Sequence, residues 1–335
     1  MRDTGIGAPI AKDPTKIASN HHVYRTSKSN QDTRNLDFIL RNGLAGGVAG
    51  CAAKTIVAPL ERIRILFQTS HSQFVQYTAH WNGLIKAARD IRMSYGMPAL
   101  FKGHSASLVR VFPYAGINFL AYEQFRAAII PSPEQEAPCR RFLCGSMAGA
   151  TSTMVTYPLE LIRTRLAFET VQKNPSSWLG ISRKIYFERG GGSLSNLYRG
   201  IAPTMLGILP YAGTSFLTHD LLRDWLRTPA LAPYTLEGPS STRLTATAQL
   251  SCGAVAGIVA QTISYPIDII RRRIQVGNVD HAKSGILETA RRVFLERGVR
   301  GFYVGLTIGY VKMAPMAATS FYVYDRMKRF LGLIK

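Results

Sequence analysis

The sequence predicts an all-α membrane protein with six transmembrane helices in three tandem repeats around a central cavity. Three observations predict this fold: long uncharged stretches, a charged motif that occurs three times, and an average hydropathy near zero. The stretch 201–218 contains no charged residue, and a spanning helix needs about 20 mostly apolar residues. Because a mean hydropathy of +0.02 is low for helices that all face lipid, we expect polar side chains to line a water-filled cavity.

The charged motif consists of a proline, an acid two residues later and a base five residues later. It reads PLERIR from Pro59, PLELIR from Pro158 and PIDIIR from Pro266, at spacings of 99 and 108 residues. Each copy follows an apolar stretch with glycines four residues apart, a pattern that lets helices approach closely. Recurrence at near-equal spacing predicts one structural unit per copy.

Each copy continues through an aromatic-x-Gly turn into a second apolar helix with its own charged end. These ends read YEQFR from Tyr122, HDLLR from His219 and YDRMK from Tyr324, so three copies of two helices give six spans. Amphipathic segments such as 81–94 and 284–295 lie between the two helices and predict short helices at the membrane surface. We expect a disordered polar tail followed by three repeats, at residues 1–35, 36–130, 138–228 and 244–333.

The formal net charge of +21 implies an anionic partner such as nucleic acid, acidic lipid or a phosphorylated solute. Nucleic acid is disfavoured because the basic residues do not gather into an arm interleaved with aromatics. The connecting segments differ in positive charge. Residues 69–102, 168–200 and 276–301 carry 4, 5 and 5 Lys or Arg, respectively. Residues 127–138 and 224–242 carry 0 and 1. The positive-inside rule places the first three on one side, although the basic N-terminal tail is an exception to this bias.

The repeats contain no recognisable arrangement of catalytic residues. They contain no Cys/His or Ser/His/Asp arrangement, and the four cysteines form no CxxC pair and no metal-ligand spacing. We therefore expect a transporter and not an enzyme, with no metal site, no catalytic residues and no cofactor. An enzyme acting at the membrane is the alternative of a different class.

The triplicated motifs and their charged partners resemble the mitochondrial carrier family, solute carrier family 25, from about residue 36 to the C-terminus. The resemblance implies a multi-pass protein of the mitochondrial inner membrane with both termini toward the intermembrane space. It also implies a monomer that exchanges solutes (antiport) by alternating access. Cardiolipin is expected at the Gly turns and the surface helices that follow the odd-numbered spans.

The resemblance further implies two gates of ion pairs between neighbouring repeats. The matrix gate would consist of Glu61–Arg163, Glu160–Arg271 and Asp268–Arg64, braced by Gln68 and Gln275. The cytoplasmic gate would consist of Glu123–Arg223, Asp220–Lys328 and Asp325–Arg126. Ala167 replaces a third bracing glutamine and His219 replaces an aromatic residue, so we expect each gate to be slightly weakened.

Residues that serve symmetric gates should recur in all copies, whereas an asymmetric solute should bind where the copies differ. Three residues before the second-helix prolines stand Arg110, Gly207 and Lys312, at positions that are mid-membrane contact points in the family. The pair Gly207-Ile208 resembles carriers of adenine-containing solutes. Two further candidates are Lys54, as an additional inward charge, and Tyr211, which matches an adenine-stacking position but fits a packing role equally well.

Several stretches, including AKTIVAPLERIRILFQTS and GHSASLVRVFPYAGINFLAYEQ, resemble the coenzyme A carriers of fungi and the related Graves-disease carrier group. The expected substrate is coenzyme A or a closely related adenine-bearing phosphate. An adenine nucleotide or ATP-Mg/phosphate carrier is the alternative within the class, while a plain ATP/ADP exchanger is disfavoured because the third copy lacks an arginine-rich run. A non-transporting scaffold or proton-leak protein is a further alternative.

Overall fold

The computed structural model describes residues 20–79, 82–131, 137–169, 177–188, 192–228, 231, 235, 244–277 and 285–333. The chain forms two compact units, one of residues 1–49 with 321–335 and one of residues 50–320. The three charged motifs and the candidate contact positions Arg110, Gly207 and Lys312 all belong to the second unit. The contacts reported below between different helices of the candidate site therefore lie within residues 50–320.

Three long helices carry the charged motifs: α1 (Asn20–Gln68), α4 (Pro138–Phe168) and α8 (Ala246–Val276). Each contains its motif proline inside the helix, where the missing N–H removes one helical hydrogen bond and favours a kink. Two of these segments, 40–68 and 246–276, are long and apolar enough to cross a membrane by length and composition.

The second helices of the repeats are α3 (His104–Ile129), α6 (Ile201–Leu226) and the pair α10 (Leu306–Val311) and α11 (Met313–Phe330). Each begins directly after a left-handed glycine at φ between +80° and +85°, which explains the aromatic-x-Gly turns. The expected sixth helix is divided by a turn at Lys312. Pro315 cannot donate to the carbonyl of Val311, but the equivalent Pro113 and Pro210 lie inside continuous helices, so proline alone does not explain the division.

The short helices between the long ones are α2 (Gly83–Tyr95), α5 (Trp178–Tyr186) and α9 (Ile286–Arg297). Four 3₁₀ helices accompany them: η2 (Val75–Ala79), η3 (Met97–Phe101), η5 (Leu194–Tyr198) and η7 (Val299–Tyr303). Three separate apolar clusters, one per repeat, join the motif helices to these segments. In the first cluster, Ile91 of α2 is fully buried with Leu66 of α1.

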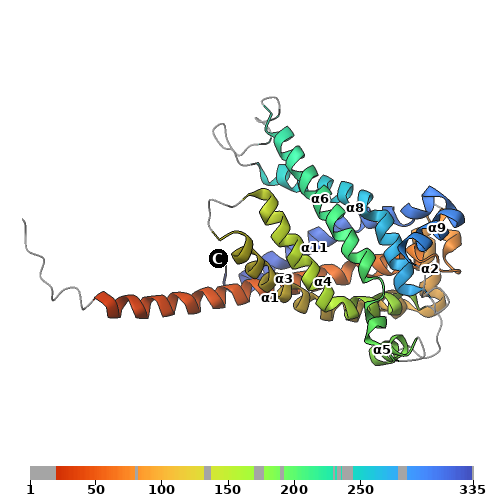
Figure 1. Ribbon diagram of the computed structural model, residues 1–335, viewed down its shortest axis with the longest axis horizontal. Helices are drawn as coiled ribbons and strands as arrows, with labels where there is room; N and C mark the ends of the chain where they lie inside the picture. The colour runs from red at the N-terminus through yellow and green to blue at the C-terminus, as the bar shows by residue number, and fades with distance from the viewer. Residues whose placement is uncertain are drawn as a thin grey trace, which may run out of the picture. The chain divides into compact units, whose positions relative to one another are not determined.

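The long helices of the second unit pack as neighbouring pairs. Helix α3 lies against α4, and α6 lies against α8 (Figure 1). These pairs join the second helix of one repeat to the first helix of the next. The described residues thus confirm the predicted all-α architecture in three repeats.

The predicted boundary of the N-terminal tail at residue 35 stays a prediction. Helix α1 begins at Asn20, whereas the tail was expected to extend to residue 35. Residues 20–35 contain no proline and no glycine, so nothing in them stops the apolar helix that follows from extending backward. Residues 1–19 lie outside the described part of the chain.

Candidate functional site

The three proline motifs meet in a set of ion pairs between neighbouring repeats. Arg163 binds Glu61 and Arg271 binds Glu160 through direct side-chain contacts. The third pair is longer, with Arg64 Nη2 3.8 Å from Asp268 Oδ2. We call these three contacts the motif ion pairs. They join the acids and bases that were paired from the sequence.

The motif ion pairs differ in burial and in the number of charges that surround them. The Glu160 side chain is only 3% exposed, and its carboxylate meets Arg110 at 3.2 Å and Arg272 at 3.5 Å besides Arg271. The Asp268 side chain, in contrast, is 37% exposed. Because a buried charge loses its hydration, Glu160 depends on these cations far more than Asp268 depends on Arg64.

The two predicted bracing glutamines bind tyrosines of the neighbouring repeat. Gln68 Nε2 donates to the Tyr265 hydroxyl at 3.1 Å, and Gln275 Nε2 donates to the Tyr157 hydroxyl at 3.0 Å. Each tyrosine directly precedes a motif proline. The tyrosine hydroxyls donate onward to the carbonyl oxygens of residues 304 and 199, just before the glycine turns. The glutamines therefore link two motif helices to the start of a second helix.

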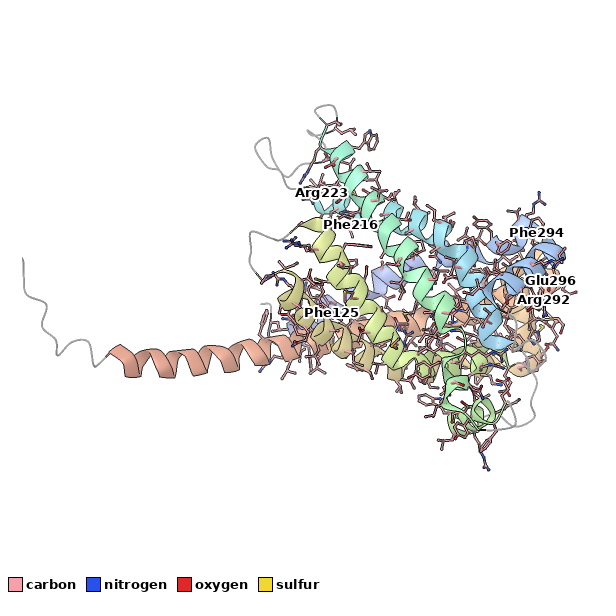
Figure 2. The ribbon with its side chains drawn as sticks, viewed as in Figure 1. Phe125, Phe216, Arg223, Arg292, Phe294 and Glu296 are labelled. Carbon is pink, nitrogen blue, oxygen red and sulfur yellow. The ribbon has the colours of Figure 1, made fainter. Side chains whose placement is uncertain are left out.

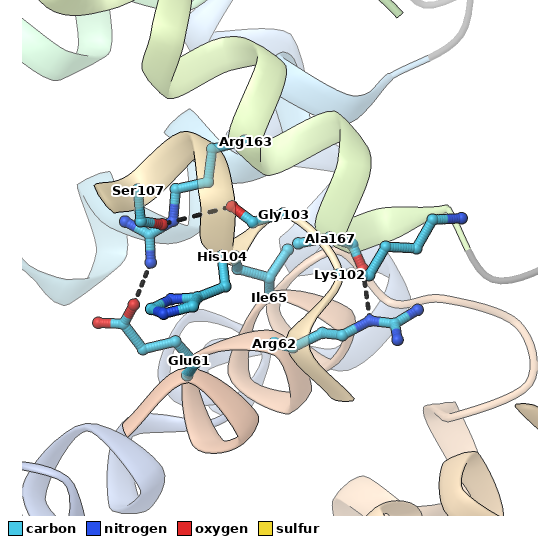
Figure 3. A pocket seen from close by; sticks show the side chains of 10 residues that line it. Glu61, Arg62, Ile65, Lys102, Gly103, His104, Ser107, Arg163 and Ala167 are labelled. Carbon is cyan, nitrogen blue, oxygen red and sulfur yellow. Dashed lines mark hydrogen bonds and ion pairs between the residues drawn. The ribbon is translucent and has the colours of Figure 1, made fainter. Parts of the chain in front are cut away.

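Between the first and second repeats, both residues of the glutamine–tyrosine link are replaced. Ala167 stands in place of the glutamine, and Ala58 stands in place of the tyrosine. Both alanines line a small gap of about 10 Å³, room for about one water molecule. Figure 3 shows Arg62 reaching the Ala167 carbonyl on one side of this gap and the Glu61–Arg163 pair on the other.

Arg62 is a structural residue that the sequence did not reveal. It is 3% exposed, and its guanidinium donates to the carbonyl oxygens of Ala167 at 3.2 Å and Glu169 at 3.1 Å. These carbonyls end α4, where helical partners are lacking. Arg62 thereby ties α1 to α4 at the place where the third link is absent.

Two other arginines make the corresponding contact between the remaining repeats. Arg165 donates to the Gly277 carbonyl at 3.3 Å, and Arg273 donates to Ser70 Oγ at 2.6 Å. Their partners and Glu169 all stand eleven residues after a motif proline. We call Arg62, Arg165 and Arg273 the clamp arginines. Arg165 and Arg273 occupy one repeat position, which sequence could have revealed, but Arg62 lies one helical turn earlier.

Arg110 and Lys312, two of the predicted contact residues, meet acids of the motif ion pairs. Arg110 Nη1 lies 3.2 Å from Glu160 Oε2, and its Nε donates to Thr156 Oγ1 at 3.1 Å. Lys312 Nζ lies 3.1 Å from Glu61 Oε1. Both cations are thus compensated inside the protein, as charges within a membrane span require.

The predicted adenine contacts Gly207, Ile208 and Tyr211 line one cavity of about 340 Å³, a volume within the range of small-molecule sites. Its lining also includes Asp268 and Arg271 of the motif ion pairs, and one further aromatic residue that the sequence analysis missed, Tyr114.

Gly207 also has a packing role. A Cβ at this position would lie 3.3 Å from Ile267 Cγ2, so the space that glycine leaves is partly taken by α8. Lys54, the remaining contact candidate, lies half-buried on α1 seven residues before Glu61. At that spacing both residues lie on one face of the helix.

The predicted pair Glu123–Arg223 is not formed in this structure. Both side chains are exposed, and Arg223 lies in the last turn of α6 (Figure 2). In that view Arg223 and the α9 residues Arg292 and Glu296 lie toward opposite ends of the second unit. The exposed positions explain the absence, because water solvates both charges there.

The other two predicted cytoplasmic pairs, Asp220–Lys328 and Asp325–Arg126, each join residues of different compact units and remain predictions. Within its own helix Asp325 pairs with Arg329 at 2.8 Å, one turn away. The Lys328 ammonium lies 4.6 Å from the centre of the Tyr324 ring. Within the described ranges, no group of three or more His, Cys, Asp or Glu side chains is arranged to hold a metal ion.

Comparison with known proteins places this geometry in a family. Residues 36–132, 134–230 and 242–335 match the model of the mitochondrial carrier protein family. Mitochondrial carrier protein LEU5 of Saccharomyces cerevisiae is 46% identical, covering 96% of this chain and 99% of the relative. Human solute carrier family 25 member 16 is 39% identical over 88% and 90% of the two chains, and maize mitochondrial carrier protein CoAc2 is 38% identical over 88% and 87%. The chain therefore belongs to the mitochondrial carrier family, and it is a mitochondrial membrane protein that transports small molecules.

Proposed function

We propose that this carrier transports coenzyme A, or a closely related adenine-bearing phosphate, across the mitochondrial inner membrane. The observation that carries the proposal is the asymmetric set Arg110, Gly207 and Lys312, where the three repeats differ. Coenzyme A presents one adenine, a 3′-phosphate and a pyrophosphate. Two cations suit the phosphates, and the cavity beside Gly207, Ile208 and Tyr211 suits the flat purine.

The motif ion pairs would act as the matrix gate, and the charged ends of the second helices as the cytoplasmic gate. The longer and partly exposed Arg64–Asp268 pair contributes about 1 kcal/mol. The net contribution of the two buried pairs is reduced by the cost of desolvating their charges, so the matrix gate can open during a transport cycle. The absent Glu123–Arg223 contact is the arrangement expected when the cytoplasmic gate is open and the matrix gate closed. Exchange would then alternate between the two gates.

The basic connecting segments favour a matrix location for the surface helices, with both termini toward the intermembrane space. We propose that the protein works as a monomer, because one chain supplies all three repeats and both gates. The glycine turns and the surface helices α2, α5 and α9 would bind cardiolipin through helix N-termini and nearby basic residues.

Uptake into proteoliposomes tests the substrate. Purified protein is reconstituted and loaded in turn with coenzyme A, adenosine 3′,5′-bisphosphate, ADP and ATP-Mg, and the exchange of labelled solute is measured. We expect fastest exchange with coenzyme A or the bisphosphate. Exchange of ADP or ATP-Mg without the other two would instead establish the nucleotide-carrier alternative, and no exchange of any solute would favour a scaffold.

A further inference from the structure

Two carboxylates of the motif ion pairs are each shared between a gate arginine and a candidate substrate cation. Glu61 binds Arg163 through Oε2 and Lys312 through Oε1, the latter at 3.1 Å. Glu160 binds Arg271 through Oε1 and Arg110 through Oε2, the latter at 3.2 Å. In both cases one oxygen serves the neighbouring motif helix, and the other holds a candidate substrate cation.

The third acid has no such second partner because position 207 is a glycine. Asp268 is paired with Arg64 at 3.8 Å, and its side chain is 37% exposed. The equivalent contact position offers no side-chain charge. The sharing therefore occurs in two of three repeats, and it follows the same asymmetry as the candidate substrate contacts.

The shared contacts are buried, so each carboxylate competes strongly with any other anion for its cation. The side chains of Lys312 and Arg110 are each 16% exposed, and those of Glu61 and Glu160 are 17% and 3% exposed. An incoming phosphate cannot bind either cation fully while the carboxylate holds it, since both anions compete for the same donors.

We propose that Glu61 and Glu160 determine affinity and selectivity, acting as built-in competitors of the substrate anion for Lys312 and Arg110. This rests on the proposed function, in which these two cations bind the substrate. An anion binds only by displacing the carboxylates; the displaced Glu61 then keeps its bond to Arg163, and the displaced Glu160 keeps its contacts with Arg271 and Arg272. Solutes with two separated phosphate groups can displace both carboxylates, whereas a monophosphate can displace one.

The test measures equilibrium binding of coenzyme A, adenosine 3′,5′-bisphosphate, AMP and inorganic pyrophosphate to the purified full chain. The variants are Glu61→Gln and Glu160→Gln, with Asp268→Asn as the matched control that also removes one gate charge. We expect each glutamine variant to bind coenzyme A about tenfold more tightly, as the loss of one charged hydrogen bond allows. Asp268→Asn removes a gate charge and changes the cavity lining but releases no substrate cation, so it should tighten coenzyme A binding less than either glutamine variant does.

The gain should be larger for the two-phosphate solutes than for AMP. Equal tightening in all three variants would overturn the inference, since loss of any gate charge would then explain it. Unchanged or weaker binding in Glu61→Gln would also overturn it. Glu160 is the more deeply buried acid, so Glu160→Gln could fail to fold. Thermal unfolding of each variant without ligand shows whether that variant is folded. If Glu160→Gln is unfolded, the binding measured with Glu61→Gln decides the test.

Failure of the proposed substrate gives a different result. If the wild type binds no coenzyme A, but Glu61→Gln binds inorganic pyrophosphate more tightly than both the wild type and Asp268→Asn, then the competition is real and the proposed substrate is wrong.

Discussion

At the scale of single residues, charges in this protein act in compensated groups. Glu160 alone meets Arg110, Arg271 and Arg272, so no single pair describes its environment. A residue's effect therefore depends on which partners remain when it is changed. At an uncharged position where two helices are close, the effect of a substitution likewise depends on the neighbouring side chains.

Gly207 allows a direct test of the cavity. We expect Gly207→Ala to lower coenzyme A uptake severalfold, because its Cβ would lie 3.3 Å from Ile267 Cγ2 and force a shift beside the cavity lining. Gly213→Ala is the matched control on the same helix, where an added Cβ meets nothing within 4 Å. Equal uptake by the two variants in proteoliposomes would argue against a substrate surface at Gly207.

His71 gives the protein a residue-level pH dependence outside the spanning helices. Burial lowers the pKa of the His71 imidazole, and the nearby charge of Arg62 lowers it further; its ring packs 4.9 Å from that of Phe168. As pH falls below about 6.5, the unfolded chain binds this proton first. The His71 contribution to stability is therefore complete above that pH and is lost as pH falls through the folded pKa.

Thermal unfolding from pH 7.5 to 5 measures this effect. We expect the melting temperature to fall less steeply with acidification in His71→Gln than in the wild type. Parallel curves for the two proteins would show that His71 is protonated equally in both states.

At the scale of elements, the clamp arginines tie each motif helix to the end of a neighbouring one, two of them through backbone carbonyls and Arg273 through a serine hydroxyl. Arg62 bonds two carbonyls at the end of α4, and Arg165 and Arg273 bond Gly277 and Ser70. Between the first two repeats this contact is more important for stability, because the glutamine–tyrosine link is absent at Ala58 and Ala167. One junction between repeats thus relies on a different residue from the other two.

Arg62→Ala should therefore lower thermal stability more than a comparable surface change. Loss of two hydrogen bonds from a buried charge costs on the order of 2–3 kcal/mol, because two carbonyls lose their donor. Arg291→Ala is the control, since this arginine is exposed on α9. Arg62→Lys should fall between them, as an ammonium cannot span both carbonyls as the guanidinium does. Equal melting temperatures for Arg62→Ala and Arg291→Ala would contradict this role.

At the scale of the whole molecule, the repeats and their charged positions could be predicted from the sequence because they recur. The pairing of Glu61, Glu160 and Asp268 with their arginines was implied by the resemblance to the carrier family that these recurring positions carry. Arg62 could not be found in this way, since the first copy has Leu66 where the others have an arginine. The contact between Glu61 and Lys312 depends on how the helices are arranged in space, and the spacing of residues in the sequence does not reveal this.

Cardiolipin provides a prediction for the assembled carrier. If the glycine turns and surface helices bind its phosphates, then added cardiolipin should raise the melting temperature in detergent by several degrees through mass action. Phosphatidylcholine at the same concentration is the control. A melting temperature that responds equally to both lipids would exclude specific headgroup recognition.

The central claim is that substrate binds where the three repeats differ, whereas the motif ion pairs that recur serve as a gate. Initial uptake of labelled coenzyme A into proteoliposomes tests this most directly, with Arg110→Ala and Lys312→Ala compared against Arg291→Ala. Loss of a charged contact of about 1.5–3 kcal/mol predicts uptake at least tenfold slower in the first two variants and unchanged uptake in the third. Uptake at the wild-type rate in both Arg110→Ala and Lys312→Ala would contradict the claim.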